Sequence, residues 1–404
     1  MSSTKKKPFS MNLRDVENFF KYRRMPYPKR SAEFIALIAV SCTLFLFLHT
    51  KSLNSRLHEM EIKLQPSELS AIGLSASNAI QSGSDSKSDL KGVHGTYQYL
   101  KSTGQMQTLN SHELNNTRKA GMEIVFFNRV PKVGSQTFME LLRRLSIRND
   151  FEFHRDAVQR VETIRLGEVQ QQELAEVITD LPEPSVFIKH VCYTNFTKFS
   201  LPAPIYINVV RDPIERVISW FYYVRAPWYF VERKAAFPEL PLPDPAWLKK
   251  DFETCVRTGD RECTFTQGVT HEGIGDHRRQ TLFFCGHDYE CTPFNTVGVL
   301  ERAKYAVESQ YSVVGVLEDL NTTFSVLEKY IPRFFKGATE VYYGGSDKLN
   351  NINRNNFKPP VSEEVKEIVR RNFTREIEFY QFCRQRLHKQ YLAVNLPHRV
   401  INRT

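Results

Sequence analysis

Two phosphate-binding signatures are missing from this chain of 404 residues. The Walker pattern Gly-x-x-x-x-Gly-Lys-Ser/Thr does not occur, and neither does the Gly-x-Gly-x-x-Gly pattern of dinucleotide-binding folds. Their absence argues against a P-loop kinase that uses ATP and against a dinucleotide-dependent enzyme. No internal repeat is found either. A chain of this length therefore has room for one large domain with appendages.

The chain after residue 30 also has little excess positive charge. The whole sequence carries +10, but residues 1–30 hold nine Lys and Arg residues against two acidic ones, a net +7 that leaves +3 for the remainder. We do not expect nucleic acid as a partner, because the basic excess lies mainly in this tail. Hydrophobic residues at 41% and aromatic residues at 12% are enough for a substantial core.

One long apolar run is present at residues 34–48, and it contains no charged side chain. With its flanks it approaches the roughly 17–25 residues that span a bilayer. A cleaved signal peptide is the alternative, but the preceding basic segment is long for one and no small-x-small cleavage pattern precedes Lys51. The positive-inside rule then predicts a single-pass type II protein with a cytosolic tail at 1–30, an anchor at 31–50 and a lumenal remainder.

Residues 51–119 are predicted to form a lumenal stem that includes a Ser-rich flexible linker at 67–92. Cysteine spacing agrees with a lumenal location, because short loops closed by disulfides are typical of an oxidising compartment. The predicted pairs are Cys255 with Cys263 and Cys285 with Cys291, four free buried thiols being the alternative; Cys192 and Cys383 are expected to be free. Candidate glycosylation sequons begin at Asn115, Asn195, Asn321 and Asn372, with one more near the terminus at Asn402.

Alternating strands and helices from residue 120 predict an α/β domain with a central parallel sheet and flanking helices. This domain is expected to cover residues 120–390 and to be followed by a tail at 391–404. Apolar runs predict strands at 123–127, 185–191, 205–210 and 311–317. Helices are expected at 138–145, 165–180, 213–220, 321–330 and 362–385.

A strand–turn–helix unit with a basic residue at the turn occurs at the first of these strands. Lys132 and Gly134 precede a helix start that carries Ser135 and Thr137. Such a turn directs backbone N–H groups and the helix dipole toward one point, and glycine lets an anion approach the backbone. Considered alone, the pattern is more typical of an ordinary capped helix than of a ligand site.

The same arrangement recurs after the strand at 205–210. Arg211 is followed by Asp212, a predicted helix cap, and by Pro213 at the first helical position, and Ser219 lies two turns further along. Parallel strands place their carboxyl ends along one edge, where α/β sheets bind nucleotides. A molecule with phosphates at both ends of a ribose would occupy both turns.

Five segments resemble the Golgi 2-O-sulfotransferase family, which sulfates uronic acids of heparan and of dermatan or chondroitin chains. They are Arg129-Val-Pro-Lys-Val-Gly-Ser-Gln-Thr137, Tyr206-Ile-Asn-Val-Val-Arg-Asp-Pro-Ile-Glu-Arg216, Phe283-Phe-Cys-Gly-His287, Pro332-Arg-Phe-Phe-Lys-Gly-Ala-Thr-Glu340 and Glu378-Phe-Tyr380. The similarity covers residues 123–385, and the N-terminal tail is most similar to the insect Pipe branch. The resemblance implies a sulfotransferase-type P-loop-like nucleotide fold, a Golgi membrane location and a homo-oligomer, trimers being known in the family.

The resemblance also implies 3′-phosphoadenosine 5′-phosphosulfate as the sulfuryl donor, and no metal. Lys132 would stabilise charge on the leaving phosphate, and His190 would remove the proton of the acceptor hydroxyl. Without the resemblance, His190 would be interpreted as a strand histidine satisfied by a hydrogen bond. The implied donor-binding residues are Lys132, Val133, Gly134, Ser135, Gln136, Thr137, Arg211 and Ser219, to which we add Lys348 and Arg354 from a loop that departs from the family pattern.

Two further departures concern the acceptor. The heparan enzyme has His-Gly-His where this chain has Ile188-Lys189-His190, and strand alternation predicts that Lys189 faces away from His190. An arginine-rich loop is replaced by residues 225–237, which have fewer basic groups and more aromatic ones. The expected substrate contacts are Arg129, Arg225, Trp228 and Tyr229, the last two being either sugar-stacking residues or ordinary core.

The resemblance therefore predicts a glycan O-sulfotransferase that acts on the 2-OH of a uronic acid or a related hydroxyl. Because of these departures from the heparan enzyme, a less densely sulfated glycan, such as one carried by a glycoprotein, is at least as good a candidate acceptor as heparan. Two other functions stay open: a catalytically inactive glycan-binding relative, and an ATP-using P-loop kinase.

Overall fold

The computed structural model describes residues 85–157, 163–270, 279–344 and 358–396, which all belong to one compact unit. The predicted cytosolic tail and membrane anchor at residues 1–50 lie outside these ranges, as do Lys348, Arg354 and Asn402. Within the described ranges, no helix is both long and apolar enough to cross a bilayer.

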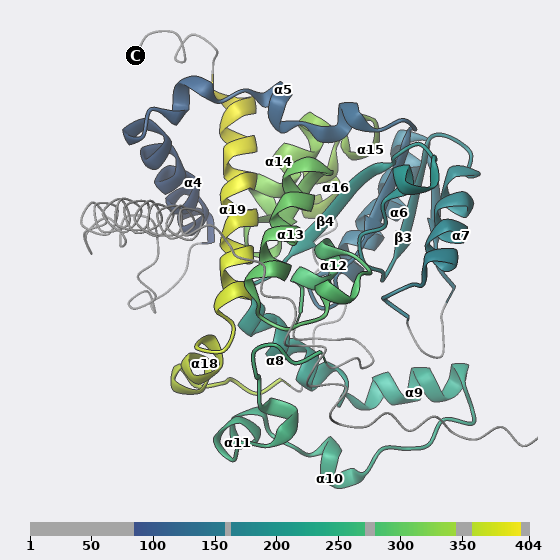
Figure 1. The fold of residues 1–404 in the computed structure, drawn as a ribbon, viewed down its shortest axis with the longest axis vertical. Coiled ribbons are helices and arrows are strands. Elements are labelled where there is room, and N and C mark those ends of the chain that lie inside the picture. Colours follow the sequence, from purple (N-terminus) through teal and green to yellow (C-terminus); the bar gives the residue numbers. More distant parts are fainter. Residues whose placement is uncertain (1–84, 158–162, 271–278, 345–357, 397–404) are drawn as a thin grey trace, which may run out of the picture. The chain divides into compact units, whose positions relative to one another are not determined.

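A five-stranded parallel sheet forms the centre of the described unit (Figure 1). The strand order is β2-β3-β1-β4-β5, with β1 at Ile124–Asn128, β2 at Glu152–Arg155, β3 at Ser185–Lys189, β4 at Ile205–Val210 and β5 at Tyr311–Val316. Strands β1, β4 and β5 are buried at every position, as parallel strands covered on both faces must be. The predicted α/β class with a central parallel sheet is confirmed. The edge strand β2 was not predicted, because its residues are charged or only half-buried.

The chain adds strands on both sides of β1: β3 and β2 lie on one side, and β4 and β5 lie on the other. Phe126 of β1 lies opposite Phe187 of β3 on one side and opposite Tyr206 of β4 on the other. In open parallel sheets, ligands bind outside the carboxyl ends of the strands, at the point where the strand order reverses. The topology therefore places a crevice beside Asn128, Lys189 and Val210, the last residues of β1, β3 and β4.

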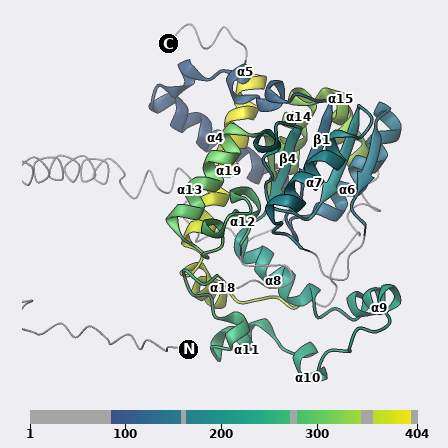
Figure 2. The same cartoon turned by 45° about the vertical axis from the view of Figure 1, so that its right-hand side comes forward.

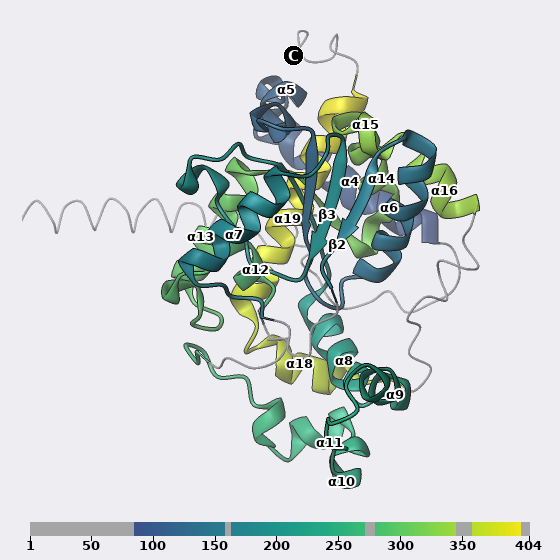
Figure 3. The same cartoon turned by 90° about the vertical axis from the view of Figure 1, so that its right-hand side faces the viewer.

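Helices cover both faces of the sheet (Figure 3). Helices α6, α14 and α16 lie on one face, α7, α12 and α13 lie on the other, and α19 packs against β5, α13 and α14. Their bounds are α6 Ser135–Asn149, α7 Glu168–Thr179, α12 Thr281–Cys285, α13 Val297–Ser309, α14 Leu320–Tyr330, α15 Pro332–Phe335, α16 Ala338–Gly344 and α19 Thr374–Asn395. Short 3₁₀ helices occur at Gln105–Thr108, Asn116–Lys119, Phe196–Phe199, Arg261–Cys263, Tyr289–Cys291 and Leu317–Asp319.

Helix α8 leads away from the carboxyl end of β4 toward three short helices (Figures 1 and 2). It buries Ile214, Val217 and Phe221 in a second apolar cluster that also contains Phe252 and Phe373. The helices of this region are α8 Pro213–Tyr223, α9 Pro227–Ala236, α10 Pro245–Leu248 and α11 Phe252–Arg257, with α18 Glu363–Arg370 packed against α8 and α11.

Both predicted disulfides are present. Cys255 is bonded to Cys263, and Cys285 is bonded to Cys291, so each closes a short local loop. Within the described residues, Cys192 and Cys383 are not disulfide-bonded, and both are buried.

The packed unit extends further toward the N-terminus than residue 120, where we expected the domain to begin. Helices α4 (Asp85–Ser102) and α5 (Ser111–Leu114) pack against α19. Asn116 Nδ2 donates to the carbonyls of Glu308 at 2.8 Å and Tyr311 at 2.9 Å, which ties this segment to the end of α13 and to β5. The part of the predicted stem from residue 92 to residue 119 therefore lies against the domain, because it buries Leu100, Met106 and Leu109 there.

The C-terminal helix predicted at 362–385 is two helices. It breaks at residues 371–373, where Phe373 turns into the apolar cluster beside Phe265 and Phe294. Helix α19 then continues to Asn395, past the start of the predicted tail at residue 391, because Leu392 and Ala393 are buried against the N-terminal helices.

Candidate functional site

The loop between β1 and α6, residues 129–134, is tightly folded. Lys132 has a left-handed φ of 65°, and Gly134 caps α6 with a φ of 76°. A left-handed conformation is uncommon for residues other than glycine and costs on the order of 1–3 kcal/mol. The left-handed φ of Gly134 favours glycine, and a Cβ there would lie 2.5 Å from Leu317 Cδ1, so that side chain would have to move.

Helix α8 begins as the sequence predicts. Asp212 accepts hydrogen bonds from the N–H groups of Ile214 and Glu215, each at 2.9 Å, and Pro213 occupies the first helical position. Arg211 therefore lies at the junction between β4 and α8.

Two arginines at the start of α8 hold the β1–α6 loop. Arg211 Nη1 donates to the carbonyl of Lys132 at 3.1 Å, and the fully buried Arg216 donates through Nη1 to the carbonyl of Pro131 at 3.5 Å. Charged donors make stronger hydrogen bonds than neutral ones. The two contacts on consecutive carbonyls help to stabilise the left-handed turn at Lys132.

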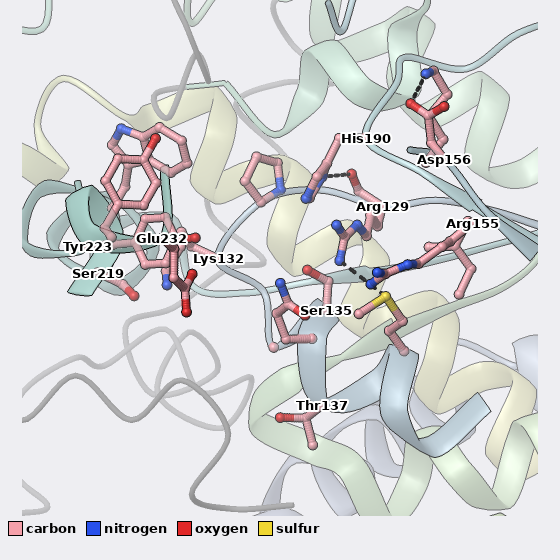
Figure 4. Close-up of a pocket in the computed structure, with 18 of the residues that line it drawn as sticks. Arg129, Lys132, Ser135, Thr137, Arg155, Asp156, His190, Ser219, Tyr223 and Glu232 are labelled. Atoms are coloured by element: carbon pink, nitrogen blue, oxygen red, sulfur yellow. Dashed lines mark hydrogen bonds and ion pairs between the residues drawn. The ribbon is translucent and has the colours of Figure 1, made fainter. Parts of the chain in front are cut away.

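A cavity of about 530 Å³ opens at the carboxyl ends of β1, β3 and β4, a size typical of small-ligand sites. In Figure 4, Ser219 and Tyr223 lie toward one side of this cavity, Arg155 and Asp156 lie toward the other, and His190 lies between them. The predicted site residues that line it together are Arg129, Lys132, Gly134, Ser135, Gln136, Thr137, His190, Arg211, Ser219 and Tyr229.

The Lys132 ammonium is buried beneath an aromatic ring. Its Nζ lies 3.7 Å from the centroid of the Tyr223 ring, close enough for a cation–π interaction. Burial and, to a smaller extent, the positive charges of Arg211 and Lys358 together lower the pKa of Lys132 to about 7. Near neutral pH, Lys132 is therefore divided between its charged and neutral forms.

His190 is held in a defined tautomer. Its Nδ1 lies 2.9 Å from the carbonyl oxygen of Arg129, and because a carbonyl can only accept, Nδ1 carries the proton. Nε2 is then left with its lone pair. Burial lowers the pKa of His190 to about 3, assisted by the charge of Arg129, while the hydrogen bond to the Arg129 carbonyl opposes this shift. The imidazole is therefore neutral at physiological pH and able to accept a proton.

Strand alternation predicts that Lys189 faces away from His190, and the structure places both residues in the lining of the cavity. Strand β3 ends at Lys189, so the alternation of a regular strand does not extend to His190. Lys189 Nζ forms an ion pair with Asp156, which follows β2 and extends the pairing of the sheet by donating its N–H to the carbonyl of Ile188 at 3.0 Å.

Arg225, which we expected to contact substrate, has a structural role instead. Its side chain forms an ion pair with Glu262 at 2.6 Å and donates to the carbonyls of Phe221 at 2.9 Å and Trp247 at 3.2 Å. The guanidinium carbon also lies 3.6 Å from the ring centroid of Phe221 and 4.1 Å from that of Trp247. Arg225 is only 6% exposed and does not line the cavity.

The two aromatic residues of α9 differ in position. Tyr229 lines the cavity, whereas Trp228 does not and packs its ring edge against Tyr223 at a centroid distance of 5.2 Å. Neither belongs to a buried core, since no residue of α9 is fully buried. Val133 has its side chain in the main core, so only its backbone can contribute to an anion site.

Sequence reasoning missed several residues of the cavity wall. These residues come from two places, the end of β2 and helices α8 and α9, and they are Arg155, Asp156, Trp220, Tyr223, Glu232 and Arg233. An Arg-Asp pair at the carboxyl end of a strand next to β3 would have been a signal, but β2 lacks the apolar run that identifies a strand.

Three of the predicted sequons are exposed on the described surface, namely those at Asn195, Asn321 and Asn372, and Asn115 is half-buried.

Among the described residues, no group of His, Cys, Asp and Glu side chains is arranged to hold a metal ion.

One family model and three relatives of this chain bear on this site. A model of the sulfotransferase family matches residues 116–383. The uronyl 2-sulfotransferase homolog pip of Drosophila melanogaster is 42% identical, over 98% of this chain and 95% of that protein. Heparan sulfate 2-O-sulfotransferase 1 of Gallus gallus is 32% identical over 64% of this chain and 69% of its own length. Uronyl 2-sulfotransferase of Mus musculus is 29% identical over 68% of this chain and 65% of its own length.

Proposed function

This chain belongs to the sulfotransferase family, and we propose that it is a glycan 2-O-sulfotransferase whose donor is 3′-phosphoadenosine 5′-phosphosulfate. One observation carries the proposal. The two basic strand–turn–helix units, at Lys132 and at Arg211, open into the same cavity as the neutral His190. The donor has anionic groups at both ends of its ribose, which matches two cationic turns from adjacent parallel strands.

The residues of the β1–α6 loop suit the phosphosulfate end of this donor. Gly134 leaves the backbone accessible, Lys132 supplies positive charge, and the hydroxyls of Ser135 and Thr137 line the same cavity. Arg211, just before α8, and Ser219, within α8, line the same cavity and suit the 3′-phosphate. Lys348 and Arg354 remain proposed donor contacts that lie outside the described residues.

The proposed reaction is an in-line displacement at sulfur. The acceptor hydroxyl oxygen forms a bond to sulfur while the bond between sulfur and the bridging phosphate oxygen breaks. The hydroxyl proton passes to Nε2 of His190, and the bonding electron pair leaves on the 5′-phosphate oxygen. Lys132 stabilises the charge that develops there, and the Arg129 carbonyl keeps the His190 tautomer that can accept the proton.

The cavity wall outside the two basic turns has mixed charge. Arg129, Arg155 and Arg233 are cationic, whereas Asp156 and Glu232 are acidic, and Lys189 is already paired with Asp156. A carboxylate such as that of a uronic acid would be attracted by the arginines, and Tyr229 can contact a sugar face. The acidic groups disfavour a chain with a sulfate on every sugar, which supports a sparsely sulfated uronic-acid glycan as the acceptor.

We propose that the catalytic domain lies in the Golgi lumen, anchored by residues 31–50 and assembled as a homo-oligomer. The two disulfides support an oxidising compartment, and the exposed sequons are open to glycosylation. The oligomer rests on family resemblance alone.

The test is transfer of labelled sulfate by the full-length chain in detergent to a panel of uronic-acid glycans, with matched glycans blocked at the 2-OH as controls. We expect label only on the unblocked glycans, and disaccharide analysis should locate it on the uronic acid. Glycan binding without transfer would identify an inactive relative. Transfer of phosphate from ATP, without affinity for the 3′-phosphorylated donor, would identify a kinase.

A further inference from the structure

The end of α8 places an aromatic ring directly on the lysine of the anion loop. Tyr223 is the last residue of α8, one turn beyond Ser219, and it lines the same cavity. Its ring centroid lies 3.7 Å from Lys132 Nζ, well within the roughly 6 Å over which a ring attracts a cation. Figure 4 shows the Tyr223 ring beside Lys132, at the Ser219 side of the cavity.

Other aromatic residues fix this ring. Trp228 packs edge-on against Tyr223 at a centroid distance of 5.2 Å, and Tyr229 and Trp220 lie at 5.0 and 5.9 Å. These partners come from both α8 and α9, so the ring is packed against two helices. The aromatic residues that distinguish residues 225–237 therefore support a contact to Lys132 as well as forming the cavity wall.

The charged surroundings explain why a ring is suitable here. Burial and two neighbouring cations disfavour the charged form of Lys132. A carboxylate against the ammonium would stabilise it, but would also repel an incoming dianion. The face of a ring attracts a cation without adding negative charge, so the ammonium stays available to a phosphate. The two neighbouring cations are Arg211 and Lys358, and Lys358 is itself paired with Glu215 at 2.9 Å. The other ionisable groups of the cavity wall near this loop are Glu232, Arg233, Arg129 and His190.

We propose that Tyr223 is a positioning residue that favours the charged form of Lys132 and directs its ammonium into the donor site before the donor binds. This role rests on the proposed function, in which Lys132 stabilises the leaving phosphate. Tyr223 would affect the reaction only through its contact with Lys132, and it would not touch the reacting atoms.

The first test compares Tyr223→Phe, which keeps the ring, with Tyr223→Leu, which removes it. kcat/KM for the donor reports groups of the free enzyme. The measurement is the pH profile of kcat/KM for the donor, and we expect Tyr223→Phe to match the wild type. Tyr223→Leu should shift the alkaline limb of this profile to lower pH by about one unit, which lowers kcat/KM at pH 7.5 about fivefold or more. Tyr305→Leu, on the exposed face of α13, serves as the matched control. It should change neither the pH of the alkaline limb nor kcat/KM at pH 7.5.

The second test does not depend on turnover. The pH dependence of Lys132 acetylation, followed by mass spectrometry in the donor-free enzyme, gives the midpoint of its titration directly. Tyr223→Leu should lower that midpoint by about one pH unit, and Tyr223→Phe should not. Tyr223→Met, which keeps more of the side-chain volume, replaces Tyr223→Leu if the leucine variant unfolds.

An unchanged midpoint in Tyr223→Leu, or equal losses in the phenylalanine and leucine variants, would overturn the proposal. If the wild type transfers no sulfate while the midpoint still moves, the proposed function fails and the role of Tyr223 stands.

Discussion

Arg211 donates from Nη1 to the backbone carbonyl of Lys132 at 3.1 Å, which joins the two halves of the candidate donor site. The residue proposed to bind the 3′-phosphate thus also holds the loop proposed to bind the phosphosulfate. Arg211 in addition lowers the pKa of Lys132, after the larger effect of burial. The two basic turns therefore depend on each other in geometry and in charge.

Replacing Lys132 with alanine should lower kcat at saturating donor by about 100-fold, because charge developing on the leaving phosphate loses its nearest cation. The measurement is turnover with labelled donor at concentrations far above KM. Lys329→Ala, exposed on α14, is the control and should retain full activity. A change confined to donor affinity would show that Lys132 only binds.

Replacing His190 with alanine should lower turnover by about 10²- to 10⁴-fold while leaving donor affinity unchanged, since the base acts on the acceptor hydroxyl. Calorimetry with 3′-phosphoadenosine 5′-phosphate measures the affinity, and labelled transfer measures the turnover. His112→Ala, at an exposed position in α5, is the matched control. Normal turnover in the His190 variant would rule out its role as the base.

The pH profile of kcat/KM for the donor should show one descending limb between pH 5 and 9. The ammonium of Lys132 is lost as the pH rises through about 7, so activity falls there. His190, whose pKa burial lowers to about 3, stays neutral across this range and contributes no acidic limb. Steady-state rates in buffers of constant ionic strength provide the profile. A profile that stays flat to pH 9 would contradict the proposed requirement for a charged Lys132.

Replacing Arg225 with methionine should lower the free energy of unfolding by about 2–4 kcal/mol, because a buried ion pair and its hydrogen bonds are lost. The KM for the acceptor should not change, since Arg225 does not line the cavity. Urea unfolding and initial rates measure the two quantities. Arg257→Met, which breaks the exposed pair with Glu364, should leave the free energy of unfolding nearly unchanged. An acceptor KM raised at unchanged stability would restore Arg225 as a substrate contact.

Local signals in the sequence determined most of the sheet and the start of the site. The apolar runs that became β1, β3, β4 and β5, and the Asp212–Pro213 cap of α8, depend on neighbours in the chain and on burial at both faces. The pairing of nearby cysteines is local as well. For the same reason, Lys132, Gly134 and Arg211 could be recognised as belonging to two turns at the carboxyl ends of strands.

Only the tertiary structure decided which side chains share the cavity, which charges are paired there, and how burial shifts their pKa values. Residues distant in sequence set the positions and charges of Lys132, Lys189 and Arg225: Tyr223 lies over Lys132, Asp156 pairs with Lys189, and Glu262 holds Arg225 away from the cavity. Burial then set the pKa of Lys132 near neutrality, and that of His190 far below it. A sequence pattern carries local conformation, whereas desolvation and charge pairing arise only when separate segments are packed together.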